Sequence, residues 1–170
     1  MVQSDNGLLK GWFYSTALCC PEGHKDVSEI LIGAKANIEA LTNDNRMPVH
    51  LASLQGHLDI VKYFVENLGI DKEVKGNINK TPLINAAEGG HSEVVKYLLG
   101  IGADIEAVTS DGFTPLHYAA QNGHKDVAEI LIGAKANLEA LTKYSLGHSD
   151  NRSLLLDSIK KEKQSIGLGT

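Results

Sequence analysis

The sequence predicts a mainly α-helical solenoid, in which helix-turn-helix pairs stack side by side and hairpin loops join them. Three observations predict this fold. A Gly-His pair recurs in steps of 33, 34 and 33 residues, at 23–24, 56–57, 90–91 and 123–124. A proline stands eight residues before each of the last three pairs, and an amphipathic run follows every pair. A period of this length is the sequence signature of a repeat architecture.

The first helix of each repeat is expected to begin at its proline, which is Pro48, Pro82 or Pro115. Proline is favoured in the first helical turn, because the amide that it lacks would have no partner within the helix. Thr81 and Thr114 directly precede two of these prolines, and a threonine side chain can cap the first turn. The start of the helix is therefore marked twice.

The second helix is expected to follow each Gly-His pair, in the runs HLDIVKYFVENL, HSEVVKYLLGIG and HKDVAEILIGAK. Their apolar residues recur at spacings of three and four, as on one face of a helix. The chain then continues through short extended stretches, where Asp111-Gly112 is a strong signal for a tight turn. Such stretches predict hairpin loops that protrude between the repeats.

The run TPLHYAAQNGHKDVAEILIGAKANLEA, residues 114–140, resembles a near-consensus ankyrin repeat, and the resemblance covers about residues 23–142. It implies an ankyrin-repeat solenoid that forms one domain over residues 1–170. Within it we expect an irregular N-terminal repeat and a C-terminal capping helix around three full repeats. The boundaries are 10–42 for the irregular repeat, 43–76, 77–109 and 110–142 for the full repeats, and 143–165 for the capping region.

The N-terminal repeat is irregular only in its first half. Residues 23–42 match residues 123–142 at all but two positions, whereas residues 11–22 match residues 111–122 only at Phe13 and Phe113. Yet a coding sequence for DGFTPLHYAAQN can be written that, two bases later, encodes WFYSTALCCPE, the sequence of residues 12–22. We therefore hypothesise an out-of-frame first helix; the alternative is a diverged N-terminal cap. The coding DNA distinguishes the two.

Composition excludes several classes of partner. Sixteen basic and 21 acidic residues give a formal charge of −5, which disfavours nucleic acid. No apolar run is long enough to span a membrane, and no signal peptide opens the chain, so a cytoplasmic location is expected. Cys19 and Cys20 are adjacent and cannot join distant segments, so we expect reduced thiols.

The sequence holds no pattern typical of catalysis or of cofactor binding. Six of the seven histidines recur at two repeat positions, which indicates a structural role and no metal site. The resemblance implies that the Gly-His histidine bonds backbone near the adjoining loops and that the other pairs with the threonine of its TPLH motif. Neither a GxSxG elbow nor a phosphate-binding loop is present. We therefore expect no enzyme, no catalytic residue, no metal and no cofactor.

Two further positions recur with the repeat. Lys35 and Lys135 stand where ankyrin repeats usually have a glycine, as Gly102 does, and each would cost about 1 kcal/mol if the position requires a positive φ. Carboxylates recur where the chain enters the hairpins, and they predict either an acidic ridge or a solvated stripe; they are Glu39, Glu73, Glu106 and Glu139.

The resemblance implies that a partner binds the concave face, which hairpin tips and the ends of the first helices form. The residues that match these positions, the tip-and-groove surface, are Asn43, Asp44, Arg46, Leu54, Gln55, Asn77, Ile78, Lys80, Glu88, Gly89, Ser110, Asp111, Phe113, Gln121 and Asn122. Aromatic and arginine side chains dominate binding energies, so Phe113 and Arg46 are expected as anchors together with Leu54. The alternative for Phe113 is an isolated exposed aromatic without a function.

Two functions agree with this pattern. The first is a protein–protein interaction module, because dissimilar side chains occupy equivalent loop positions on a repeated framework. The alternative is a structural remnant of a longer ankyrin array that has no partner of its own. Weak self-association through the irregular N-terminal repeat is also expected, since an uncapped solenoid end exposes apolar surface.

Overall fold

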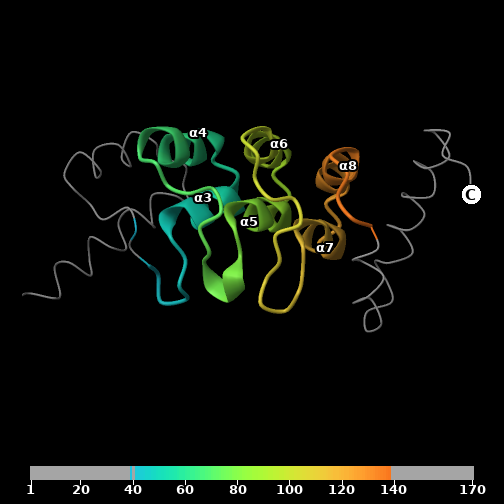
Figure 1. Cartoon of the computed structure of the whole chain (residues 1–170), viewed down its shortest axis with the longest axis horizontal. Coiled ribbons are helices and arrows are strands. Elements are labelled where there is room, and N and C mark those ends of the chain that lie inside the picture. The colour runs from blue at the N-terminus through green and yellow to red at the C-terminus, as the bar shows by residue number, and fades with distance from the viewer. Residues whose placement is uncertain (1–38, 40, 139–170) are drawn as a thin grey trace, which may run out of the picture.

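The computed structural model describes residue 39 and residues 41–138, which form three helix pairs in a row (Figure 1). The first helices are α3 (Pro48–Gln55), α5 (Pro82–Gly89) and α7 (Pro115–Gln121). The second helices are α4 (Leu58–Lys62), which continues as the π-helix η1 (Tyr63–Asn67), α6 (Ser92–Gly100) and α8 (Lys125–Gly133). The chain is thus a solenoid of stacked helix-turn-helix pairs, as predicted.

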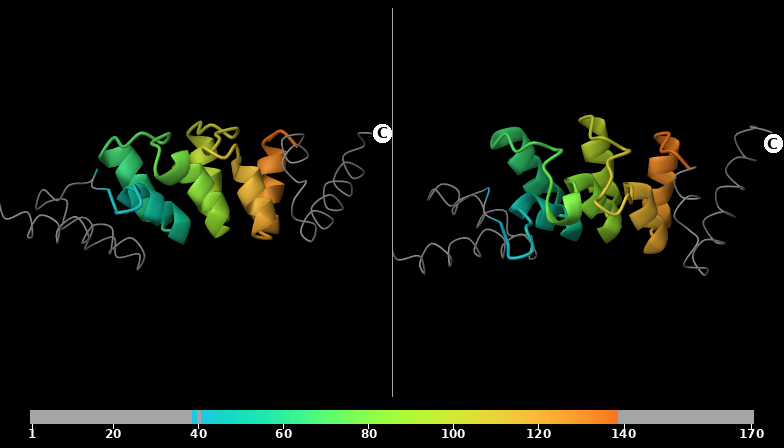
Figure 2. Two further views of the ribbon diagram at one scale, coloured as in Figure 1. Left: turned by 90° about the horizontal axis from the view of Figure 1, so that it is seen from below. Right: turned by 60° about the horizontal axis from the view of Figure 1, so that its bottom comes forward.

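The helices form two layers, with first helices packed on first helices and second helices on second helices. The views in Figure 2 keep the three pairs in the same order along the long axis of the molecule. The hairpin loops project from the layer of first helices, on the side away from the second helices (Figure 1). None of the helices in the described part of the chain is long and apolar enough to cross a bilayer.

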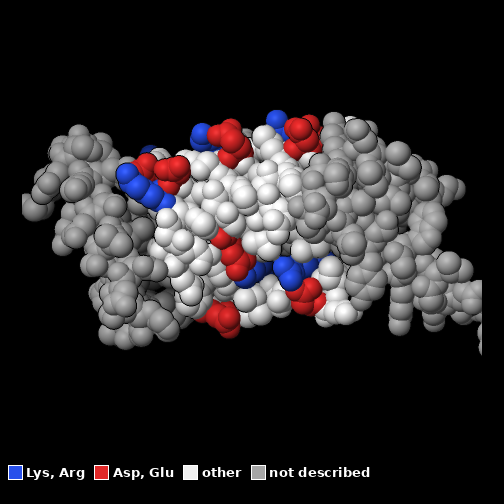
Figure 3. Space-filling model, turned by 180° about the vertical axis from the view of Figure 1, so that it is seen from behind, with Lys and Arg blue, Asp and Glu red and all other residues white. Residues whose placement is uncertain are grey.

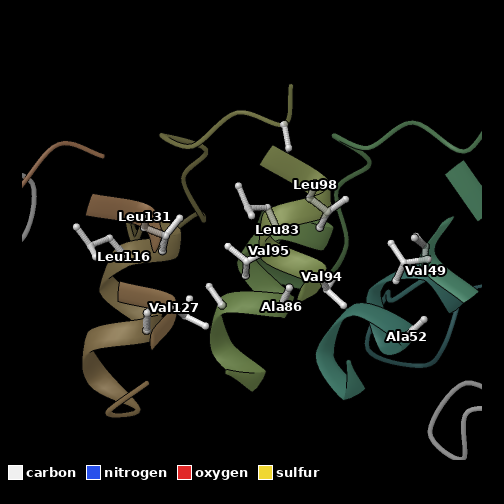
Figure 4. Packing of buried hydrophobic residues seen from close by; sticks show 14 of the residues in the cluster. Val49, Ala52, Leu83, Ala86, Val94, Val95, Leu98, Leu116, Val127 and Leu131 are labelled. Carbon is white, nitrogen blue, oxygen red and sulfur yellow. The ribbon is translucent and has the colours of Figure 1, made fainter. Parts of the chain in front are cut away.

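The core lies between the two layers and continues from one pair to the next (Figure 4). Leu83 of α5 and Leu98 of α6 are almost fully buried there, as are Leu116 of α7 and Leu131 of α8. Each pair buries its apolar faces against its neighbours as well as within itself. For this reason a single pair would not be stable alone.

The expected starts of the first helices are confirmed. Thr81 and Thr114 are the N-cap residues of α5 and α7, and each Oγ1 accepts a hydrogen bond from the amide three residues later. In α3, Met47 has no hydroxyl group, and its amide donates to Nδ1 of His50 over 3.1 Å. Nε2 of the same ring donates to the carbonyl of Val74, so the buried imidazole uses both of its nitrogens.

The Gly-His histidines tie neighbouring repeats together, as the resemblance implied. Nε2 of His91 donates to the Leu54 carbonyl at the end of α3, and Nε2 of His124 donates to the Glu88 carbonyl near the end of α5, both over 2.9 Å. These carbonyls belong to the last helical turn, which offers no amide partner within the helix. Each histidine therefore caps the first helix of the preceding repeat.

The step of 34 residues arises from one extra residue in η1. The amides of Ala103 and Ala136 donate to the carbonyl five residues earlier, whereas the equivalent amide of Ile70 donates to the carbonyl of Phe64, six residues earlier. A π-helical turn accommodates such an insertion. Phe64 stays buried at the position equivalent to Leu98, so the core is unchanged.

Three hairpin loops connect the repeats, over residues 42–46, 76–80 and 109–113. In each of them the first amide donates to the last carbonyl, over 2.9, 2.9 and 3.0 Å. The expected tight turn at Asp111-Gly112 is confirmed, because Gly112 has a φ of 79° and its amide donates to the Thr109 carbonyl. Within the described residues these loops are not long enough to be assigned as β-strands.

Lys135 has a φ of 70°, as expected from the glycine that ankyrin repeats usually have there, and Gly102 has a φ of 78° at the equivalent position. We predict that Lys135→Gly raises the free energy of unfolding by about 1 kcal/mol, because glycine adopts this conformation without steric cost. Gly102→Lys should lower it by a similar amount, because its positive φ disfavours a side chain. A Cβ at Gly102 would meet no atom within 4 Å, so no steric clash adds to this cost. Urea denaturation measures both, and changes of the same sign would contradict the prediction.

Several predictions concern residues outside the described part of the chain. They are the irregular repeat at 10–42 with its frame-shift hypothesis, the thiols Cys19 and Cys20, the conformation of Lys35, and the capping region at 143–165. Of the full repeats, 43–76 and 77–109 are described throughout, and 110–142 is described to Leu138.

Candidate protein-binding surface

The tip-and-groove surface combines the hairpin loops with the first helices. Arg46, Lys80 and Phe113 occupy the same position, next to the N-cap residue of α3, α5 and α7. At the other end of these helices Leu54, Glu88 and Gln121 are equivalent, as are Gln55, Gly89 and Asn122. The three repeats thus place chemically different side chains at matched points.

Lys80 and Glu88 form the centre of this surface. The ammonium group of Lys80 lies 2.7 Å and 2.8 Å from the two carboxylate oxygens of Glu88, and 4.4 Å from the ring centroid of Tyr118 on the next repeat. The side chain of Lys80 is only 14% exposed. The two charges therefore neutralise each other, and the pair also bridges two repeats.

Phe113 is half-buried and is not an isolated aromatic on a loop tip. Its ring meets His117 edge-on, with the centroids 5.3 Å apart, and lies 5.9 Å from the ring of Tyr118. Pairs of this geometry stabilise a protein beyond the area that they bury. Phe113, expected as an anchor for a partner, therefore also stabilises the fold through these contacts.

Arg46, the second expected anchor, forms an ion pair with Asp44 in the same hairpin. Hydrogen bonds from Arg46 and from the Thr42 hydroxyl hold the pKa of Asp44 below its usual value. The Nε atom of Arg46 is buried and has no hydrogen-bond partner among the residues that the structure describes. A partner would have to compete with Asp44 for this guanidinium group.

The other predicted residues lie where the repeat positions place them. Those that are exposed are Asn43, Gln55, Asn77, Ile78, Ser110, Asp111, Gln121 and Asn122. Leu54 is half-buried. The side-chain Nδ2 of Asn122 donates to the carbonyl of Glu88 over 2.9 Å, which adds a contact between repeats. In Figure 3 acidic and basic side chains lie beside one another on the face that it shows, without a broad patch of either sign.

Gly89 is half-buried and serves the packing of the first helices. A Cβ atom at this position would lie 2.2 Å from the Leu54 carbonyl oxygen and 2.6 Å from Cδ2 of His91. Real Cβ atoms do not approach so closely. The glycine therefore permits the close approach of α3 and α5.

The sequence analysis missed the position that Leu51, Asn85 and Tyr118 share in the first helices. Tyr118 is half-buried beside Lys80 and Phe113, so it belongs to the surface. The signal was present, because these three residues differ as much as the residues at the predicted positions do. Asn85 is buried, and within the described part of the chain its Nδ2 atom has no hydrogen-bond partner.

Asn85→Leu should raise the free energy of unfolding by about 1–2 kcal/mol. The substitution keeps the number of side-chain heavy atoms. It removes the buried Nδ2 group, whose desolvation costs free energy that no hydrogen bond to a described residue offsets. Asn122→Leu is the matched control: Asn122 is exposed and bonded, so no gain in stability is expected there. Thermal and urea denaturation measure both variants, and a loss of stability in Asn85→Leu would contradict the prediction.

Two of the recurring carboxylates bond backbone of the next repeat. Glu73 accepts the amide of Asp104 over 2.8 Å, and Glu106 accepts the amide of Asn137 over 2.7 Å. Each bond reaches from one repeat to the next. These side chains thus link neighbouring repeats.

The histidines follow the structural pattern. His117 accepts the Thr114 hydroxyl over 2.8 Å, as expected for the TPLH motif, and His91 and His124 bond backbone carbonyls. Burial lowers the pKa of His50 and of His91, because the charged imidazolium is poorly solvated there. Among the described residues, no three His, Cys, Asp or Glu side chains are grouped so that they could hold a metal ion.

Residues 3–76 and 72–141 match the family described as ankyrin repeats (3 copies). The chain belongs to the ankyrin-repeat family. Ankyrin repeats are generally protein–protein interaction modules, and they are typically not enzymes. The first match spans residues 11–22, where the sequence lacks the ankyrin motif.

The chain matches a small part of each of several similar proteins. The chain is 45% identical over 65 residues to alpha-latrotoxin-Lh1a of Latrodectus hasselti, which is 38% of the chain and 5% of the toxin. It is 36% identical over 86 residues to delta-latroinsectotoxin-Lt1a of Latrodectus tredecimguttatus, or 50% of the chain and 7% of the toxin. It is 30% identical over 83 residues to palmitoyltransferase ZDHHC13 of Homo sapiens, or 49% of the chain and 13% of the enzyme. The chain thus spans at most 13% of these three relatives.

Proposed function

We propose that this chain binds a partner protein through its tip-and-groove surface. The observation that carries the proposal is the contrast between a constant framework and variable side chains at equivalent points. A guanidinium, an ammonium and a phenyl group stand at the same position before three first helices that each begin with a proline. Variation on a rigid scaffold is how repeat proteins present binding surfaces.

The contacts between repeats support this proposal, because they hold the surface in one shape before a partner arrives. His91, His124, Glu73 and Glu106 each bond backbone of a neighbouring repeat. Lys80 contacts its own helix through Glu88 and the next repeat through Tyr118. A preorganised surface loses less conformational entropy on binding, so more of the contact energy contributes to affinity.

Affinity capture from the native cell extract, followed by binding measurements with the purified partner, tests the proposal. Phe113→Ala and Arg46→Ala would remove the two expected anchors, but both side chains also stabilise the fold. Gln55→Arg tests binding with less effect on folding, because Gln55 is exposed on α3. Asn67→Arg is the matched control, because it adds the same side chain to exposed surface on η1, in the layer of second helices. We expect Gln55→Arg to weaken binding at least about tenfold and Asn67→Arg to leave it unchanged.

If both variants bind as the wild type does, the partner does not use this surface. A chain that captures no specific partner supports the alternative, a remnant of a longer array. Its relatives support that alternative too, because the matched region is a minor part of each. Weak self-association and a cytoplasmic location stay predictions, which light scattering and a fluorescent fusion would test.

A further inference from the structure

The second hairpin, residues 76–80, differs from the other two in its first residue. In the first and third hairpins Thr42 Oγ1 accepts the amide of Arg46 over 3.0 Å, and Thr109 Oγ1 accepts the amide of Phe113 over 3.1 Å. Gly76 holds the equivalent position and has no hydroxyl group. The side-chain bond that braces the other two loops is therefore absent.

The preceding repeat accounts for glycine at this position. A Cβ atom on Gly76 would lie 3.0 Å from Nε2 and 3.1 Å from Cδ2 of the buried His50 ring. The equivalent residue before the third hairpin is Ile84, and there Thr109 is accommodated. The imidazole of His50 thus takes the space that a threonine at residue 76 would need.

The backbone of the second hairpin has a different conformation at its tip. Ile78 has φ 46° and ψ 35°, and Asn79 has φ 60°. In the flanking hairpins only the next residue, Asn45 or Gly112, has a positive φ. A β-branched residue in the left-handed region is a genuine outlier, and such strain persists where the surrounding structure or a function requires it.

Burial does not compensate this strain, because Ile78 is 38% exposed. Its carbonyl accepts the amide of Ser110 over 2.8 Å, which holds the tip against the third hairpin. The equivalent residues are Asp44, which is paired with Arg46, and Asp111, which is exposed and has no ion pair with any residue that the structure describes. The row of tips therefore carries an exposed isoleucine between two carboxylates.

We propose that Ile78 inserts into an apolar pocket of a partner protein whose rim carries a basic side chain that meets Asp111. This inference rests on the proposed function and names the chemistry of the partner. The carboxylates disfavour an anionic membrane surface or a phosphate backbone as the occupant. An apolar pocket would bury the side chain that the fold exposes, and a basic group on its rim complements the charge of Asp111.

An amphipathic peptide of lysine and leucine is a defined probe of this chemistry, and a glutamate–leucine peptide of equal length is its charge control. In titrations of the full chain followed by amide NMR, the lysine peptide should perturb residues 43–46, 77–80 and 110–113. The glutamate peptide should bind at least about tenfold more weakly. Ile78→Asn should weaken binding of the lysine peptide about fivefold or more, and Asp111→Lys about threefold.

Two matched controls carry the same changes elsewhere. Ile101→Asn alters an isoleucine that is 36% exposed at the end of α6, and Asp59→Lys alters an exposed aspartate on α4. Both should leave binding unchanged. Ile78→Asn should be at least as stable as the wild type in urea, because asparagine tolerates the left-handed conformation. A weakened affinity with unchanged stability then reports contact at the tip.

The inference is overturned if Ile78→Asn binds the lysine peptide as the wild type does, or if the control variants weaken binding equally. The captured partner separates this outcome from failure of the proposed function. If Gln55→Arg weakens its binding and Ile78→Asn does not, the tip inference fails while the binding function stands. If neither variant affects the captured partner, both fail.

Discussion

Gly89→Ala is expected to lower the free energy of unfolding by about 2–3 kcal/mol, although alanine favours helices more than glycine does. The added Cβ would lie 2.2 Å from the backbone oxygen of Leu54 and 2.6 Å from the His91 ring. A backbone oxygen cannot rotate away, so α5 would have to shift from α3. The same oxygen accepts the hydrogen bond of His91, and that bond between repeats would weaken as well.

Gly100→Ala is the matched control, because a Cβ there meets no atom within 4 Å. Gly100 ends α6 and is exposed, so alanine should stabilise the helix by up to about 1 kcal/mol. Urea denaturation followed by circular dichroism gives both values. If the two substitutions change stability in the same direction, a clash of the Gly89 Cβ with α3 does not explain the loss.

Acid is expected to destabilise the array through His50, which is fully buried between its two hydrogen bonds. Burial lowers the pKa of His50 from 6.5, so below pH 6.5 the unfolded chain binds a proton that the folded chain does not. The contribution of His50 is therefore complete above pH 6.5 and is lost as the pH falls toward the lowered pKa. The slope reaches at most about 1.4 kcal/mol per pH unit for one proton.

His50→Gln should reduce this slope between pH 7 and 5, because glutamine can accept and donate hydrogen bonds without titrating. A smaller slope should remain, since the pKa of His91 is also lowered and that ring is less buried. Asp44→Asn is the control, because the pKa of Asp44 lies below 3.8 and it does not titrate in this range. Urea midpoints at several pH values measure the slopes, and equal slopes for wild type and His50→Gln would refute the assignment.

The framework of the fold could be predicted from local signals that repeat. A proline preceded by a threonine is favoured at the start of a helix, and a lysine at a position where ankyrin repeats usually have glycine indicated the left-handed backbone that Lys135 adopts. The period indicated that the Gly-His histidines are structural, and the resemblance to ankyrin repeats implied their backbone partners. Each of these signals depends on residues close in sequence or on a position that recurs.

The chemistry of the surface was less predictable, because it depends on side chains that meet across repeats. Lys80 contacts Tyr118 only because two repeats stack in register, and nothing near Lys80 in the sequence points to that ring. Gly89 was predicted as a surface residue, because the sequence does not show that the Leu54 carbonyl of the preceding repeat lies against it. The carboxylates of Glu73 and Glu106 looked solvated, since their partners are backbone amides 31 residues away.

The extra residue in η1 shows where this architecture tolerates a change in length. The insertion lies in the outer layer, and the chain returns to register at Ile70, whose amide reaches the carbonyl of Phe64. The next hairpin and α5 therefore begin at the same place as they would without it. A second helix can therefore take up an added residue while the hairpins and first helices keep their spacing, so repeat length can change without altering the tip-and-groove surface.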